Sequence, residues 1–214
     1  MSVSAALGFD HVVSDLEELV ELCGLPDEAV RSKVIDRLDR HCRDFIARSP
    51  LFLLGTCDAA GRCDVSPRGG PPGFVEVLDD RRLAFGNAKG NRLIDSFRNI
   101  RETGRVGMLF LIPGLGETLR VNGRACLTRD PELLARHEIQ PGKPPAIAVG
   151  VEVEEAFLHC AKAFIRSTLW DPATWPSRDG LARPAQIWKD HMALPDLTVA
   201  SVEELVEESY GELY

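Results

Sequence analysis

The stretch FGNAKGNRLIDSFRNI, from Phe85 to Ile100, predicts a strand, a turn and then a helix, and the rest of the chain can be interpreted around it. Its turn combines glycines, asparagines, Lys89 and Arg92. Glycine lets a backbone approach a ligand closely, and the first amides of a helix carry partial positive charge. The turn therefore predicts a site for a phosphate monoester, with both cations at its rim.

The spacing of this turn also fits a simpler structure, in which Asn91 caps the helix and both cations are solvated. The phosphate loop GxxxxGK[ST] and the dinucleotide fingerprint GxGxxG are both missing. Two further polar clusters favour a ligand. Ser66 and Arg68 end one predicted strand before a Gly/Pro corner, and Thr118 and Arg120 lie on a strand expected beside it.

Composition restricts the classes of partner. The chain has 214 residues, a formal net charge of −8 and a pI near 5.2. This acidic balance disfavours nucleic acid as the main partner, because such binding relies on clustered cations. No apolar run approaches the length of about 20 residues that spans a bilayer, and the N-terminus lacks a secretory pattern. We expect a cytoplasmic protein with no membrane partner.

The cysteines and histidines do not predict a metal site. The six cysteines form no CxxC pair, and the five histidines form no HExxH motif. In a cytoplasmic chain of this size, most of the cysteines are expected to be reduced and buried.

Hydrophobic periodicity predicts the organisation. Apolar residues at helical spacing predict an amphipathic leader helix from Asp27 to Arg48. Turn signals at 58–61 and 79–82 predict two hairpins, Asn122-Gly123 predicts a bulge, and Asp130 is expected to cap a short helix over 131–138. About six strands predict a mainly β (α+β) antiparallel barrel. We expect a helical leader over 1–50, a barrel over 51–170 and a wrapping tail over 171–214.

Four stretches resemble the pyridoxamine 5'-phosphate oxidase superfamily of FMN-binding split barrels, in particular an uncharacterised bacterial subgroup. They are DVSPRGGPPGFVEVLDD, FGNAKGNRLIDSFRNI, GRVGMLFLIPGLGETLRVNGRACLT and VEVEEAFLHCAKAFIRSTLWDP. The resemblance covers about Leu51 to Pro172 and implies a split β-barrel with flanking helices. It also implies a homodimer with two flavin mononucleotides at the subunit interface and a small-molecule substrate.

By this resemblance the phosphate lies at Asn87–Arg92. Asn91 stands where the family has a cation, and Lys89 is expected to supply the missing positive charge. The flavin ring lies along the strand that follows Ser66–Arg68 and continues to Phe74 and Val75. Thr118 stands where the authentic oxidases have a glutamine. The implied cofactor-binding residues are Ser66, Pro67, Arg68, Phe74, Val75, Asn87, Lys89, Gly90, Asn91, Arg92, Thr118, Arg120, Lys162, Arg166 and Trp170.

Lys162, Arg166 and Trp170 follow one another at i, i+4 and i+8, which places them on one face of a predicted helix. This face is expected either to meet the flavin edge or to be a surface stripe of cations with Trp170 packed into the core. The tail of the chain does not reproduce the segment that binds the substrate phosphate in the true oxidases. We therefore do not expect this chain to share their vitamin substrate. Trp175, Trp188, Lys189 and His191 in this tail are expected to form either a lid or a structural clasp.

The leading hypothesis is an oxidoreductase that passes hydride or electrons between a small organic substrate and FMN. Two alternatives remain open. One is a flavin-binding sensor or carrier without turnover. The other is the same barrel with haem or a deazaflavin in place of FMN.

Overall fold

The computed structural model describes residues 8–88, 90, 92–138, 140 and 142–211. Its internal contacts divide the chain into two units, with the boundary between Val34 and Ile35. The elements are α1 (Leu16–Cys23), α2 (Glu28–Ser32), α3 (Arg40–Ile46), β1 (Leu51–Cys57), β2 (Cys63–Gly69), β3 (Val75–Val77), β4 (Arg82–Gly86), α4 (Asp95–Thr103), β5 (Arg105–Leu111), β6 (Thr118–Thr128), α5 (Pro131–Arg136), β7 (Ala148–His159), α6 (Lys162–Ser167), η2 (Pro172–Thr174), α7 (Pro184–Met192) and α8 (Val199–Gly211).

The single leader helix predicted from Asp27 to Arg48 is wrong. The structure has two short helices there, α2 and α3, with non-helical chain between them. Ile35 pairs with Ala156 through two backbone hydrogen bonds of 3.0 and 2.7 Å, which requires extended chain. Asp39 then starts a new helix, because its carboxylate accepts a hydrogen bond from the Cys42 amide at 2.8 Å.

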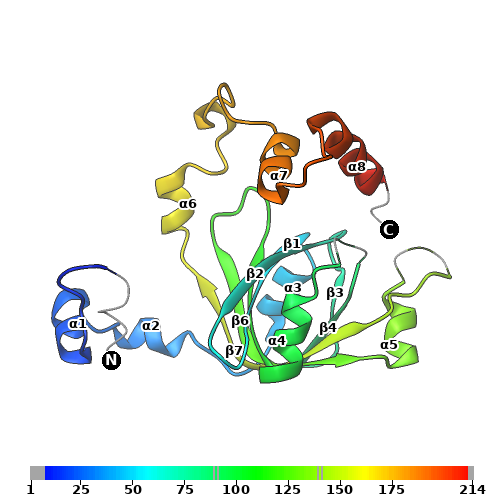
Figure 1. Cartoon of the computed structure of the whole chain (residues 1–214). Coiled ribbons are helices and arrows are strands. Elements are labelled where there is room, and N and C mark those ends of the chain that lie inside the picture. The colour runs from blue at the N-terminus through cyan, green and yellow to red at the C-terminus, as the bar shows by residue number, and fades with distance from the viewer. Residues whose placement is uncertain (1–7, 89, 91, 139, 141, 212–214) are drawn as a thin grey trace. The chain divides into compact units, whose positions relative to one another are not determined.

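The second unit is built around a seven-stranded antiparallel sheet, one strand more than the sequence indicates (Figure 1). The strand order is β2-β1-β5-β6-β7-β4-β3, so β2 and β3 are the two edges. The two predicted hairpins are confirmed as β1–β2 and β3–β4. The predicted bulge is confirmed as well, because the β6–β7 register shifts between Asn122 and Gly123.

Gly123 sits where only glycine fits, since a Cβ at this position would lie 2.0 Å from the Glu152 carbonyl oxygen. The short helix after the bulged strand is confirmed as α5. Its N-cap Asp130 accepts hydrogen bonds from the Glu132 and Leu133 amides at 2.9 and 3.2 Å. The bulge and the helix cap could be predicted because each depends on the backbone conformation or hydrogen bonds of adjacent residues and not on distant ones.

The core lies between the curled sheet and the helices α3 and α4. Phe52 is fully buried, and its ring centroid lies 5.7 Å from Phe74, 5.0 Å from Phe85 and 5.1 Å from Phe110. Alternate residues of β1 and β5 point inward, as expected for strands with one buried face. Helix α3 adds Phe45 and other apolar side chains to the same cluster.

Helix α4 packs against β1, β2, β5 and β6. It buries Phe97 and Ile100, and it ends at Gly104, whose φ of 62° stops the helix. Its buried Asn99 donates a hydrogen bond from Nδ2 to Thr56 Oγ1 on β1 at 3.0 Å. The position of α4 on the sheet is therefore fixed by polar as well as apolar contacts.

The helices α7 and α8 pack against each other beyond the sheet (Figure 1). Ala185 and Val202 are the residues that they bury, and an ion pair of 2.6 Å joins Arg183 to Glu203. Among the described residues, no helix combines the length and apolar character needed to cross a membrane.

Replacing Phe52 with Ala should lower the free energy of unfolding by about 3–5 kcal/mol, because it empties the centre of the aromatic cluster. Urea denaturation measures this loss. The control is Val65→Ala, on the outer face of β2 and 66% exposed, which should change the free energy of unfolding by no more than about 0.5 kcal/mol. Similar losses in the two variants would contradict the core assignment.

Candidate functional site

A large pocket lies where the two edge strands of the sheet approach the start of α4 and the end of α5. Its volume is about 2270 Å³, and residues of β2, β4, α4, α7 and α8 line it together with Glu76 of β3. Ligand pockets commonly measure about 300–1,000 Å³. This pocket therefore has room for a mononucleotide cofactor and a small second molecule.

The inward face of β2 supplies polar side chains to this pocket. Asp64, Ser66 and Arg68 alternate with exposed residues along the strand. The hydroxyl of Ser96, in the first turn of α4, donates to Asp64 Oδ2 at 2.7 Å and lies 3.1 Å from Ser66 Oγ. This network ties the start of α4 to the edge strand.

Arg68 is the most distinctive cation of the site. Its guanidinium carbon lies 5.2 Å from the centroid of the Phe97 ring, in a cation–π arrangement. Burial lowers the pKa of Arg68 below its usual value, and the charge of Asp64 partly opposes this shift. Its Nε is buried and has no hydrogen-bond partner among the described residues. Such an orphaned donor is costly unless a ligand completes it.

The helix that follows the opening turn begins later than the sequence indicates. The sequence places its start near Asn91, whereas α4 begins at Asp95. Arg92 has a φ of 62°, which is incompatible with a right-handed helix at that residue. The N-cap Ile94 offers no side-chain acceptor to the first-turn amides. The residues that start α4 line the pocket, so the positive end of the helix lies at its wall.

Acidic side chains also face this pocket. Asp95 lines it and forms an ion pair with Arg98 one helical turn later. Asp64 and Glu138 line it as well. The pocket is therefore mixed in charge, and any anion must bind close to the arginines and the helix start.

The Gly/Pro corner after β2 positions Phe74 against the pocket. A Cβ on Gly70 would lie 2.8 Å from Cγ of Phe74, so only glycine allows this ring to pack there. Gly73 adopts a φ of 88°, and the Phe74 amide donates to the Pro71 carbonyl at 3.0 Å. The corner thus turns the chain tightly and places an aromatic ring beside the site.

A Glu76–Arg136–His137 cluster was not indicated by the sequence. Arg136 Nε donates to both carboxylate oxygens of Glu76, at 3.0 and 3.1 Å, and His137 Nε2 lies 3.3 Å from Glu76 Oε2. Burial lowers the pKa of His137, Glu76 opposes the shift, and Arg136 adds to it. All three line the pocket. Because Glu76 is distant in sequence from Arg136 and His137, no local motif could reveal the cluster.

The C-terminal helices contribute the remaining wall. Trp188 and His191 of α7, two of the residues expected to form a lid or clasp, line the pocket together with residues of α8. Trp175 does not line it; its Nε1 donates to the Leu169 carbonyl at 2.9 Å. Lys189 also lies outside the pocket wall, within 3.5 Å of Asp190.

The structure brings about half of the predicted cofactor-binding residues together. Those that line the pocket are Ser66, Pro67, Arg68, Phe74, Asn87, Gly90 and Arg92. Val75 is buried in β3 beside Phe74. Lys89 and Asn91 lie outside the described residues.

The other predicted residues lie elsewhere in the same unit. Thr118 is buried at the start of β6, and the Arg120 guanidinium lies over the Phe157 ring at 5.3 Å. Lys162 and Arg166 are exposed on α6. None of these side chains lines the pocket within the part of the chain that the structure describes.

The prediction that Trp170 continues the helix face of Lys162 and Arg166 is wrong. Helix α6 ends at Ser167, and Thr168 takes a left-handed φ of 48°. Trp170 instead stacks on Phe164, with ring centroids 5.9 Å apart, and donates from Nε1 to the Leu115 carbonyl at 2.9 Å. Its contacts are those of a packed residue.

Together the antiparallel sheet with two free edges, the flanking helices and the pocket between those edges define a split-barrel protein. A family model described as pyridoxamine 5'-phosphate oxidase matches residues 38–160, more than half of the chain. The chain belongs to the pyridoxamine 5'-phosphate oxidase family. No curated protein matches the chain.

The solved structures to which the chain is similar include three bacterial proteins. HupZ of Group A Streptococcus is 18% identical, and the alignment covers 56% of this chain and 92% of that one with a TM-score of 0.46. HutZ, the heme storage protein of Vibrio cholerae, is 18% identical, with 57% and 94% covered and a TM-score of 0.41. General Stress Protein 26 of Bacillus anthracis str. Sterne is 15% identical, with 54% and 88% covered and a TM-score of 0.39.

The lowered pKa of His137 predicts a loss of stability on acidification. Below its ordinary pKa of 6.5, the unfolded chain takes up a proton more readily than the folded protein, so the free energy of unfolding falls as pH decreases. Urea denaturation at about pH 7.5 and about pH 5.5 measures this change. In His137→Gln the decrease should be smaller, because Gln does not titrate. An equal or larger decrease in the variant would contradict the assignment.

Proposed function

We propose that the protein is a cytoplasmic flavoprotein that binds FMN in this pocket and transfers hydride or electrons between the cofactor and a small organic substrate. The observation that supports this proposal best is Arg68, which lines a cofactor-sized pocket and has a buried Nε without a hydrogen-bond partner among the described residues. Membership of the pyridoxamine 5'-phosphate oxidase family supports it as well.

The residues at the pocket fit this cofactor. Arg92, Gly90 and the amide end of α4 would hold the phosphate, because a planar guanidinium and free amides both suit phosphate oxygens. Phe74 and Phe97 would pack against the flat ring system. Arg68 would complete its hydrogen bonds on a ring or ribityl oxygen. The rest of the pocket wall, which carries both positive and negative side chains, would then be free to bind a substrate.

When bound, FMN supplies the two-electron chemistry. The chain's own contribution is to hold the ring, restrict water and place charge beside it. The half-buried Arg68 guanidinium would stabilise negative charge on a reduced ring more strongly than a solvated cation does. Burial lowers the pKa of His137, which favours the neutral imidazole, and the neutral ring could accept a proton from a substrate bound near Glu76.

We further propose that two copies of the chain form a homodimer with two such sites. Lys162 and Arg166 are exposed and do not line the pocket of their own chain, and by family resemblance they would face the cofactor held by the other copy. Light scattering of the purified protein distinguishes a dimer from a monomer. A monomer that binds FMN with full affinity would contradict this part of the proposal.

The absorption spectrum of the purified protein is the first test. We expect the near-ultraviolet and blue bands of an oxidised flavin, which a reductant bleaches. A Soret band would instead indicate haem, and absorption bands at positions other than those of a flavin would indicate a deazaflavin. Stable flavin bands that no electron donor bleaches would favour a sensor or carrier. Any of these three results would contradict the proposed reaction.

Replacing Arg92 with Ala should weaken FMN binding by about 1.5–3 kcal/mol, the scale of a charge-assisted hydrogen bond. Fluorescence titration measures the affinity for FMN and for riboflavin, which lacks the phosphate. Riboflavin affinity should be unchanged in this variant, whereas Arg68→Ala should weaken both ligands.

The matched control is Arg101→Ala, because Arg101 is exposed in the last turn of α4, at the opposite end of that helix from Arg92. It should bind FMN as the wild type does. An equal loss of riboflavin and FMN affinity in Arg92→Ala would overturn the phosphate assignment.

A further inference from the structure

Two cysteines lie directly opposite each other at the end of the β1–β2 hairpin. Cys57 is the last residue of β1 and Cys63 the first of β2, and the register pairs them. Two hydrogen bonds identify the hydrogen-bonded pairs of this ladder. The Asp58 amide donates to the Arg62 carbonyl oxygen, and the Gly70 amide donates to the Pro50 carbonyl oxygen, each at 3.0 Å. Pairs alternate along a ladder, so Cys57 and Cys63 form a non-hydrogen-bonded pair.

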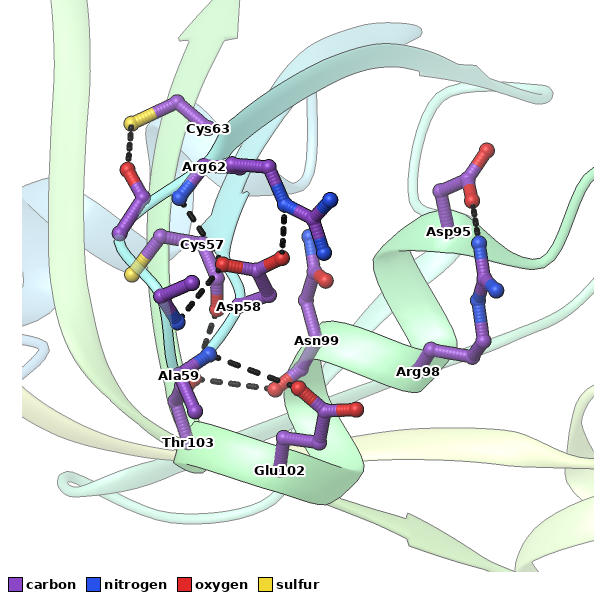
Figure 2. A network of polar contacts seen from close by, with 12 residues as sticks. Cys57, Asp58, Ala59, Arg62, Cys63, Asp95, Arg98, Asn99, Glu102 and Thr103 are labelled. Carbon is purple, nitrogen blue, oxygen red and sulfur yellow. Dashed lines mark hydrogen bonds and ion pairs between the residues drawn. The ribbon is translucent and has the colours of Figure 1, made fainter.

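This kind of pair suits a disulfide. Opposed residues at non-hydrogen-bonded positions have Cα atoms about 4.5 Å apart, inside the range of roughly 4.4–6.8 Å that a disulfide spans. Figure 2 shows both sulfur atoms on the same side of the hairpin, with the Cys63 thiol turned toward the Gly61 carbonyl oxygen at 3.7 Å. A side-chain rotation of Cys63 therefore brings the sulfurs together without a change of register.

Both thiols are open to a reagent. They belong to the outward-facing positions of their strands; Cys63 is exposed and Cys57 is half-buried. The expectation that most cysteines are buried is wrong for this chain, because only Cys42 is buried. Burial raises the pKa of the Cys42 thiol to about 11, which keeps it protonated and unreactive. Among the described strands, the register places no other two cysteines opposite each other.

The tip of the hairpin is held in place on α4 (Figure 2). The Thr103 hydroxyl lies 3.1 Å from the Cys57 carbonyl oxygen, and the Ala59 amide lies 3.4 Å from Glu102 Oε2. Within the loop, Asp58 Oδ1 accepts hydrogen bonds from the Ala60 and Arg62 amides, both at 2.9 Å. These contacts keep the two strand ends in register, so little conformational freedom is lost when the sulfurs bond.

We propose that Cys57 and Cys63 are a thiol–disulfide modification site that closes reversibly across the hairpin. With a low-molecular-weight disulfide such as oxidised glutathione as oxidant, the Cys63 thiolate attacks one sulfur and releases the first thiol. Cys57 then attacks the mixed disulfide at Cys63 and releases the second thiol. Two protein thiols are oxidised and one external disulfide is reduced to two thiols. No flavin takes part, so this inference does not depend on the proposed function.

Peptide mapping tests the site directly. The full-length protein is equilibrated with reduced and oxidised glutathione, free thiols are alkylated, and the chain is denatured and digested with trypsin. Cleavage after Arg48, Arg62 and Arg68 places Cys57 in peptide 49–62 and Cys63 in peptide 63–68. We expect the two peptides to appear joined, in a fraction that rises with the oxidised share of the buffer and returns to zero with excess dithiothreitol.

Matched variants separate this pair from the other cysteines. Cys63→Ser and Cys57→Ser should each abolish the joined peptides, whereas Cys126→Ser, at another exposed strand cysteine, should retain them. Cys63→Ser changes an exposed side chain and is informative even where Cys57→Ser folds poorly. Wild-type protein that yields only separate glutathione adducts, or that links Cys63 to another cysteine or another chain, would overturn the proposal.

Discussion

The hydrogen bonds between α4 and the β1–β2 hairpin determine the geometry of the pocket. At the start of the helix, Ser96 joins Asp64 and Ser66, and in its middle Asn99 joins Thr56. Ser96, Asn99 and Thr56 are buried, so leaving any of their polar atoms without a partner would be costly. This constraint places the amide end of α4 beside Arg68. The position of the candidate site therefore follows from how one helix is attached to one edge strand.

The same attachment explains why the pocket can carry opposing charges. Arg68 has Phe97 as a neighbour instead of a carboxylate partner, whereas Asp95 pairs with Arg98 and Glu76 pairs with Arg136. Arg68 therefore carries a positive charge without an ion-pair partner among the described residues, whereas two of the four acids of the wall, Glu76 and Asp95, are paired with arginines. A ligand with one anionic end and one neutral polar end matches such a wall better than a uniformly charged molecule does.

Features encoded by adjacent residues could be predicted from the sequence. The two hairpins, the bulge at Asn122-Gly123 and the Asp130 cap depend on local backbone chemistry, and all appear in the structure. The long helix over 27–48 failed because Ile35 pairs with Ala156, a contact that helical periodicity cannot reveal. The arginines and glycines that line the candidate site carry residue-type signals, so the sequence could single them out. The Glu76–His137 part of the site could not be predicted, because it arises from tertiary contact alone.

Pro67 has a consequence for how copies of this protein can associate. It lies on an edge strand, opposite Leu53 in a position where the backbone nitrogen points away from β1. Any other residue there would offer an amide hydrogen to an approaching strand, and proline offers a ring without a donor. The open side of β2 is thus a poor template for adding a foreign strand. A second copy that approached this edge would have to contact it mainly through side chains.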